Sequence, residues 1–220
     1  MTGPARRAPR PRTAVRRAPE KQVHDRAALD DLLDTALVAH VAVVDGGQPY
    51  VVPLGLARDG DRVLVHGSTA SRAFRLLATG APSCTTVTVV DGVVVARSQF
   101  ESSMRYRCAM ILGAFTALDG EEAAAALAVL AARLLPGLTG ARPPSGQERR
   151  ATSVLALPLR EWSLKVSAGF PQDAPEDLDR PVWAGVVPLH HVWGEPEPAP
   201  GLAPGIPVPQ ALRDWAPGRA

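Results

Sequence analysis

The chain has 220 residues, a formal net charge of +2 at pH 7 and a hydrophobic content of 46%. This length suits one domain with a substantial core or two small ones. No apolar run is long enough to cross a bilayer, and the N-terminus lacks the apolar core of a signal peptide, so we expect a cytoplasmic protein without a membrane partner.

Charge and proline are unevenly distributed along the chain. Residues 1–26 carry eight Lys or Arg against two acids, and the 22 Pro and 19 Gly cluster at both ends and in the 136–146 connection. The basic segment has the charge to bind nucleic acid, but a solvated arm that partly folds back to hold an anion is the simpler interpretation, so we expect no nucleic-acid partner. We therefore expect a basic arm (1–22), a compact domain (23–193) and a Pro-rich tail (194–220).

The two cysteines, Cys84 and Cys108, are too few for a disulfide framework, and each lies in an apolar, strand-like run. Such residues are typical of buried free thiols. The sequence has no Cys-x-x-Cys motif and no cluster of Cys and His, so we expect no metal site.

Hydrophobic periodicity predicts three helices and seven or eight strands, most of them in antiparallel hairpins. Asp25 is the expected N-cap of the first helix. Asp91-Gly92 predicts a tight hairpin turn between two strands, and Gly113 predicts a bulge or a close backbone approach. The predicted helices are 25–37, a short one before Gly80 and 121–135, and the predicted strands are 38–44, 49–56, one from Val63, 83–90, 93–100, 106–117, 153–159 and 162–167.

A long connection through the 121–135 helix separates the first six predicted strands from the last two. An acidic, Pro-rich loop (170–181) and an apolar segment that packs on the body (182–192) follow them. Together these elements predict an α+β fold, a mostly antiparallel closed or split β-barrel with peripheral helices.

The third predicted strand runs directly into the start of a helix, and this junction has the composition of an anion site. Gly67 allows a tight bend, and Ser68 or Thr69 is the expected cap of the helix. A helix start exposes unpaired N–H groups. Ser71 adds a hydroxyl, and Arg72 and Arg75 add fixed positive charge, which is the chemistry that a phosphate requires. The alternative interpretation is an ordinary capped helix with a solvated arginine.

A set of short motifs occurs in one order from about Arg12 to about Pro209. In that order they resemble the pyridoxamine 5′-phosphate oxidase-like superfamily, the FMN-binding split barrels, and within it the flavin-nucleotide-binding branch that includes nitroimidazole-resistance proteins. Singly each motif is weak. The motifs are Arg12-Thr13 with Arg16-Arg17, the helix from Asp25, His40-Val41, Gln48 to Pro53, Ala57 to Asp61, His66-Gly67-Ser68 with Ser71-Arg72, Asp91-Gly92, Ala96-Arg97-Ser98 with Phe100, Ser103-Met104 with Tyr106-Arg107, Lys165-Val166 and Trp183 to Leu189.

The resemblance implies a homodimer with two FMN sites at the subunit interface. It places the phosphate at Ser71 and Arg72 and the isoalloxazine along Val51–Leu54, partly enclosed by the other subunit. Because the flavin carries the chemistry, no dedicated catalytic acid or base is expected. The residues implied at the cofactor are Val51, Val52, Pro53, Leu54, His66, Gly67, Ser68, Ser71, Arg72, Arg97, Tyr106 and Arg107.

The sequence departs from the family pattern mainly on the substrate side. The second basic residue of the phosphate site is replaced by Ala73. After Phe100 the close branch reads His-His-Ser-x-Asn-Tyr-Arg-Ser, whereas this chain has Glu101 and Arg105 at the first and fifth of these positions. We therefore expect specialisation for a small-molecule substrate, contacted by Glu101, Arg105, Lys165 and Trp183.

Histidines leave alternatives open. His66 is either a cofactor or substrate contact or a hydrogen-bonded structural imidazole. His190 and His191 lie in a segment that some distant split barrels use to hold haem, but adjacent residues of an extended strand cannot both face one pocket.

The expected function is an FMN-dependent oxidoreductase acting on a small organic molecule. The alternatives are a non-catalytic flavin- or haem-binding protein and a haem enzyme on the same barrel, with cofactor F420 less favoured.

Overall fold

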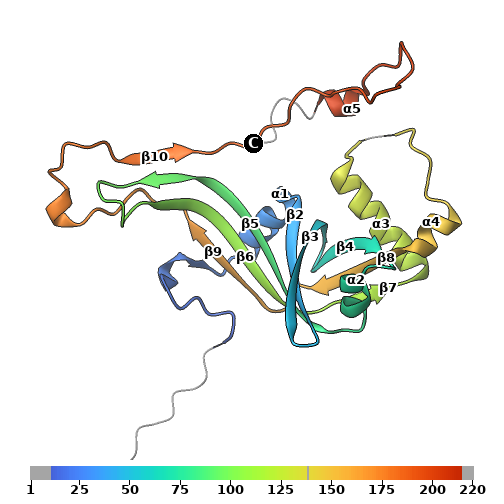
Figure 1. Cartoon of the computed structure of the whole chain (residues 1–220), viewed down its shortest axis with the longest axis horizontal. Helices are drawn as coiled ribbons and strands as arrows, with labels where there is room; N and C mark the ends of the chain where they lie inside the picture. Colours follow the sequence, from blue (N-terminus) through green and yellow to red (C-terminus); the bar gives the residue numbers. More distant parts are fainter. Residues whose placement is uncertain (1–10, 138, 215–220) are drawn as a thin grey trace, which may run out of the picture.

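The structure is a computed structural model of the chain, and it describes residues 11–137 and 139–214. Figure 1 shows a large twisted sheet with helices around it. The strands are β1 (Gln22–Val23), β2 (Val38–Asp45), β3 (Gln48–Asp59), β4 (Arg62–Ser68), β5 (Pro82–Val95), β6 (Ser103–Ala114), β7 (Thr116–Leu118), β8 (Thr152–Pro158), β9 (Trp162–Ser167) and β10 (Gly185–Pro188). The helices are α1 (Arg26–Thr35), α2 (Arg72–Ala78), α3 (Gly120–Leu134), α4 (Gly146–Ala151) and α5 (Gln210–Arg213), with two short 3₁₀ turns, Pro19–Lys21 and Pro175–Asp177.

All strand pairs of the sheet are antiparallel. Nine strands follow the order β1-β9-β6-β5-β2-β3-β4-β8-β7, and β10 pairs separately with β5. The twelve-residue strand β3 pairs with β2 through its first part and with β4 through its last, so it carries the chain from one half of the sheet to the other. The sheet does not close, and the predicted α+β split-barrel fold is confirmed.

Helix α1 fills the space between the two halves of the sheet. Its Leu29, Leu32 and Leu33 are fully buried, at the i, i+3, i+4 spacing that puts side chains on one helix face. They pack with inward-facing residues such as Val41 and Ile111. A second, smaller core joins α3 to the opposite face of β4 and β8 through Ala57, Leu64, Ala126, Leu130, Val154 and Ala156.

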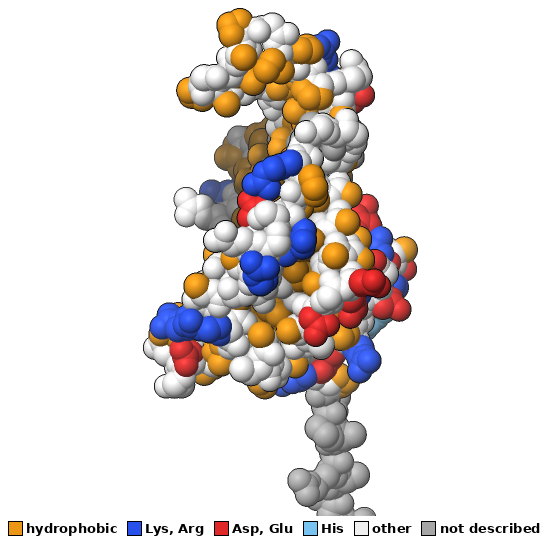
Figure 2. All heavy atoms as spheres, turned by 90° about the vertical axis from the view of Figure 1, so that its right-hand side faces the viewer, with side chains coloured by type: hydrophobic (Ala, Val, Ile, Leu, Met, Phe, Trp, Pro, Cys, Tyr) orange, Lys and Arg blue, Asp and Glu red, His pale blue; other side chains and the backbone are white. Residues whose placement is uncertain are grey.

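The long strands β5 and β6 extend beyond the barrel as an arm, flanked by β9 and β10 (Figure 1). The chain turns back before β10 at the tip of the arm, and beyond β10 it continues over the body (Figure 1), where it forms the overhang in the upper part of Figure 2. It comes close to the body again near α5, where a Cβ on Gly137 would lie 3.2 Å from that of Ala211.

The predicted hairpin turn at Asp91-Gly92 is wrong. Strand β5 runs through both residues, with a register shift between Val90 and Gly92, and the chain reverses instead between Val95 and Ser103. A Cβ on Gly92 would lie 2.6 Å from the carbonyl oxygen of Val187 in β10. The glycine therefore serves the close approach of a third strand, and the Asp-Gly pair forms a bulge.

Several other predictions are confirmed with small shifts. Asp25 caps α1 by accepting a hydrogen bond from the Ala27 N–H. Gly113 is a site of close approach, because a Cβ there would lie 2.9 Å from Leu157 Cδ1. The predicted strand 106–117 is divided into β6 and β7, and α4 was not predicted.

The described part of the N-terminal arm folds back onto the body, and the cysteines are less buried than expected. The described part of the basic arm packs on β9, where Arg12 pairs with Glu161 and Lys165 donates to the Arg17 carbonyl at 3.1 Å. Residues 1–10 of the arm and 215–220 of the tail lie outside the described residues.

Both cysteines are free thiols but only half-buried, and burial raises the pKa of Cys84. Of the helices in 11–137 and 139–214, none is long and apolar enough to cross a bilayer.

Candidate functional site at the β4–α2 junction and the sheet face

The junction between β4 and α2 forms as a strand, a turn and a capped helix. The Ser68 hydroxyl accepts from the Ala70 N–H at 3.1 Å, and the Ser71 hydroxyl accepts from the Phe74 N–H at 3.5 Å. Gly67 is required by packing, because a Cβ there would lie 2.3 Å from the ring of the buried Phe74. The predicted strand, bend and helix are therefore present, but the N-cap is Ser71 and not Ser68 or Thr69, because the chain turns once more before the helix begins at Arg72.

Arg72 is held across the β2–β3 turn. Its guanidinium lies 3.9 Å from the centre of the Tyr50 ring, a cation–π contact, and its Nε lies 3.9 Å from an Asp45 carboxylate oxygen. More than half of the side chain remains exposed. The guanidinium is thus oriented but still has donors to offer an anion. The sequence did not predict the roles of Tyr50 and Asp45.

His66 lies on β4 next to an open part of the sheet face. The register Leu56↔Val65 places Gly55 beside His66, and Val38 pairs with Gly55 from the other side. A Cβ on Gly55 would meet no described atom within 4 Å. The Nδ1 atom of His66 is buried and has no hydrogen-bond partner among the described residues. The structure therefore gives no support to a hydrogen-bonded structural imidazole.

The strand implied for the isoalloxazine presents only alternate side chains to the outside. Val52 and Leu54 pack against the core, whereas Val51 and Pro53 are exposed. Val51 is 60% exposed and Val44 on the neighbouring strand 56%. This face of β2 and β3 is therefore apolar and uncovered in a single chain. A flat ring there could contact Val51, Pro53 and backbone groups, but not the side chains of Val52 and Leu54.

The predicted arginines of the arm already have partners. Arg107 donates to both Asp91 oxygens at 3.1–3.2 Å and to Asp31 at 2.9 Å, and these carboxylates raise its pKa. Arg97 donates to the carboxylate of Asp173, whose side chain is 3% exposed. These two arginines fasten α1 and the 168–181 loop to the arm, which is a structural role.

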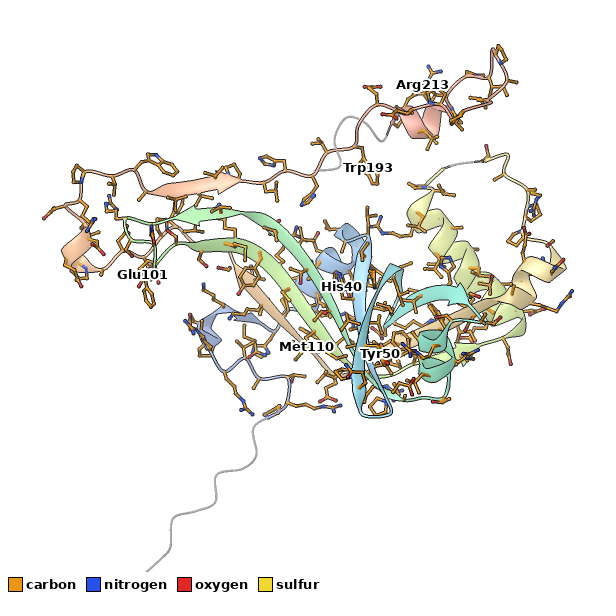
Figure 3. The ribbon with its side chains drawn as sticks, viewed as in Figure 1. His40, Tyr50, Glu101, Met110, Trp193 and Arg213 are labelled. Atoms are coloured by element: carbon orange, nitrogen blue, oxygen red, sulfur yellow. The ribbon has the colours of Figure 1, made fainter. Side chains whose placement is uncertain are left out.

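The predicted substrate residues lie on the arm, away from the junction. Arg105 stacks on Phe170 at 5.0 Å and donates to the Gly169 carbonyl. Figure 3 places Glu101 at the tip of the arm and Tyr50, the partner of Arg72, far from that tip in the body of the molecule. Tyr106 lies on β6 opposite Ser167. Lys165 donates a hydrogen bond to the N-terminal arm. Trp183 is exposed and lies beside Gly185. One chain therefore brings the junction residues together but leaves Arg97, Glu101, Arg105 and Trp183 in a separate group.

Helix α4 begins with a capping box that stabilises its position. Ser145 accepts from the Glu148 N–H, Glu148 accepts from the Ser145 N–H, and Arg142 donates to Glu148. These donors lower the pKa of Glu148 to about 2, with Arg142 the largest cause. The pattern Ser-x-x-Glu at 145–148 is the signal by which α4 could have been predicted.

The Glu148 pKa gives a pH prediction. Because the folded value lies below the ordinary 4.5, the stabilisation of α4 is complete above that value and is lost as the pH falls toward about 2. A carbon-13 NMR titration of the Glu148 carboxyl is expected to show this low midpoint. In Arg142→Ala the midpoint should rise toward the ordinary value, and an unchanged midpoint would show that Arg142 is not the cause.

Fold and junction together define a split barrel of the flavin-binding kind. The family model described as pyridoxamine 5′-phosphate oxidase matches residues 25–166, and the chain belongs to this family. No curated protein sequence gives a significant match.

Solved structures extend the likeness to most of the chain. A FAD and haem binding protein from Mycobacterium smegmatis is 46% identical, with a TM-score of 0.86, covering 89% of this chain and 97% of its own. The flavocytochrome Anf3 from Azotobacter vinelandii is 36% identical, also with a TM-score of 0.86, covering 94% and 97%. A putative 5-nitroimidazole antibiotic resistance protein from Bacteroides thetaiotaomicron is 22% identical over 66% of this chain and 86% of its own, with a TM-score of 0.56, and shares the fold.

Proposed function

We propose that this protein is a homodimer that binds a flavin and a haem and transfers electrons between them and a small-molecule substrate. Two relatives that match nearly the whole chain carry both cofactors according to their names, one as a FAD and haem binding protein and one as a flavocytochrome. The single observation in this chain that carries the proposal is the half-buried His66, which lies beside an open part of the sheet and whose Nδ1 has no partner among the described residues.

The flavin fits the junction and the uncovered face of β3. Ser68, Ser71 and Arg72 supply hydroxyls and an oriented guanidinium for a phosphate. Val51 and Pro53 offer an apolar surface for the ring. The sequence favoured FMN, but the 46%-identical relative is described with FAD, and we propose FAD for this chain.

His66 is the proposed haem ligand. Imidazole is a common axial ligand of haem iron. Because Nδ1 of His66 is already covered by the protein, Nε2 of this half-buried side chain would be the nitrogen offered to the iron. The other histidines, His24, His40, His190 and His191, are all exposed. Of these, His190 and His191 follow β10 and are the candidates for a second ligand.

A homodimer would join the two groups of predicted site residues. In one chain the arm and the junction lie at different ends of the sheet (Figure 3). A two-fold dimer is isologous, so the arm of one copy can lie over the junction of the other. Large apolar side chains left exposed in the single chain support this arrangement, among them Val44, Val51, Val93, Phe100, Met104, Phe170 and Trp183.

Each cofactor would supply its own chemistry. A bound flavin accepts a hydride or single electrons, and a bound haem passes single electrons. The protein would then provide binding and orientation, with Glu101 and Arg105 as polar contacts for a small substrate. No acid or base of the chain needs to take part.

The absorbance spectrum of the purified protein tests the proposal. We expect flavin bands together with a Soret band. A flavin spectrum without haem would reduce the function to that of a flavoprotein. A colourless protein that takes up neither FAD nor haemin would contradict the proposal.

A further inference from the structure

An open pocket of about 450 Å³ lies between α3, α4 and the edge of the sheet formed by β7 and β8. Its floor is apolar, made by Leu118, Ala123, Leu127 and Val154. Its rim carries Arg149, Arg150 and the carboxylate of Asp119. Figure 2 views the side of the molecule that bears α3 and α4 and shows basic side chains set among apolar ones. The pocket therefore combines a flat apolar surface with positive charge.

The two arginines of the rim lie close together without an acidic partner. Arg150 Nη1 is 3.4 Å and Arg149 Nη2 4.0 Å from the point where a Cβ on Gly146 would stand. Neither takes part in any of the salt bridges within residues 11–137 and 139–214, because the neighbouring Glu148 is taken by Arg142. Arg149 Nη1 also donates to the Pro144 carbonyl at 2.5 Å. Two like charges near one point repel each other, and an anion between them would relieve the repulsion.

The pocket adjoins the end of β4 that leads into the junction. Ser68 pairs with Thr152, which lines the pocket, and the Thr69 N–H donates to the Ala151 carbonyl at 3.0 Å. Residues 64, 66 and 68 of β4 lie on one face of the sheet, where Leu64 packs with Val154 in the second core. Helix α2 packs on the opposite face, where Phe74 meets Gly67. A ligand that passes from the junction around the end of β4 onto this face would reach the pocket.

We propose that this pocket holds the adenosine end of a dinucleotide flavin, with a phosphate at Arg149 and Arg150. The inference rests on the proposed flavin binding. Adenine has a flat apolar face that suits the floor, and Asp119 is an acceptor for ribose hydroxyls. The pocket thereby selects FAD over FMN, since FMN lacks the adenosine end.

Flavin affinity measured by fluorescence titration tests the inference. FAD should bind the full-length chain at least about tenfold more tightly than FMN, as expected for charge-assisted hydrogen bonds to phosphate. The double variant Arg149→Ala/Arg150→Ala should weaken FAD about tenfold or more and leave FMN within about twofold. Ala124→Leu, which fills the pocket from an exposed helix position without changing charge, should also weaken FAD alone.

Arg160→Ala is the matched control, since Arg160 is an exposed arginine at a separate site near Arg26 and Asp61. It should leave both affinities unchanged. Equal weakening of FAD by this control, equal weakening of FAD and FMN by the double variant, or equal parent affinities for the two flavins would each overturn the inference while leaving flavin binding intact. Absence of binding by either flavin would overturn the proposed function as well.

Discussion

Replacing His66 with alanine is expected to remove the Soret band of the purified protein while the flavin bands remain. This half-buried side chain lies beside the open part of the sheet, and its Nδ1 has no partner among the described residues. Loss of an axial ligand should lower haem affinity by more than the roughly 10- to 100-fold typical of changes to groups that only support a ligand. Haem and flavin content per chain, measured on the same preparation, give the result.

The matched control is His24→Ala, a change at an exposed histidine in the loop before α1. It should retain both chromophores at the parent level. If His66→Ala keeps its haem, the iron is held elsewhere, and His190 and His191 become the residues to test. If it loses haem and flavin together, His66 supports the whole site instead of one cofactor.

Gly67→Ala is expected to destabilise the fold by about 1–3 kcal/mol, the usual cost of overpacking. The new methyl group would stand 2.3 Å from a ring carbon of Phe74. Phe74 is 3% exposed and belongs to the main core, so the ring has no free space to move into. Thermal and urea unfolding of the variant should both show the loss.

Gly169→Ala is the control for the same chemical change. This glycine is exposed, its Cβ would meet no described atom within 4 Å, and its φ lies outside the left-handed region. The substitution should leave stability unchanged or raise it by up to about 1 kcal/mol through the unfolded state. Similar destabilisation by both substitutions would show that the contact with Phe74 is not what makes Gly67 necessary.

The sequence predicted the fold well wherever a local pattern had one physical meaning. The leucines of α1 repeat at helical spacing, and Asp25 has the chemistry of a cap, so the helix was found close to its observed ends. At the β4–α2 junction, Gly67 and the apolar residues around it predicted the strand, the bend and the helix, although the cap was expected about three residues too early. The order of such motifs then identified the family.

Patterns that depend on distant partners were misread or missed. Asp91-Gly92 is a strong turn signal in isolation, but β10 packs against Gly92 from nearly a hundred residues away and Arg107 takes the carboxylate of Asp91. The pocket of Arg149 and Arg150 depends on α3, α4 and β8 meeting in space, which no local pattern records. The separation of Glu101 from the junction likewise follows from the length of the β5–β6 arm.

Size-exclusion chromatography with light scattering and full-spectrum absorbance is the most direct test of the central claim. We predict one peak with the mass of two chains, in which the ratios of flavin absorbance and Soret absorbance to protein absorbance are constant across the peak. A monomeric peak, or a dimer peak that carries neither chromophore after incubation with FAD and haemin, would contradict it.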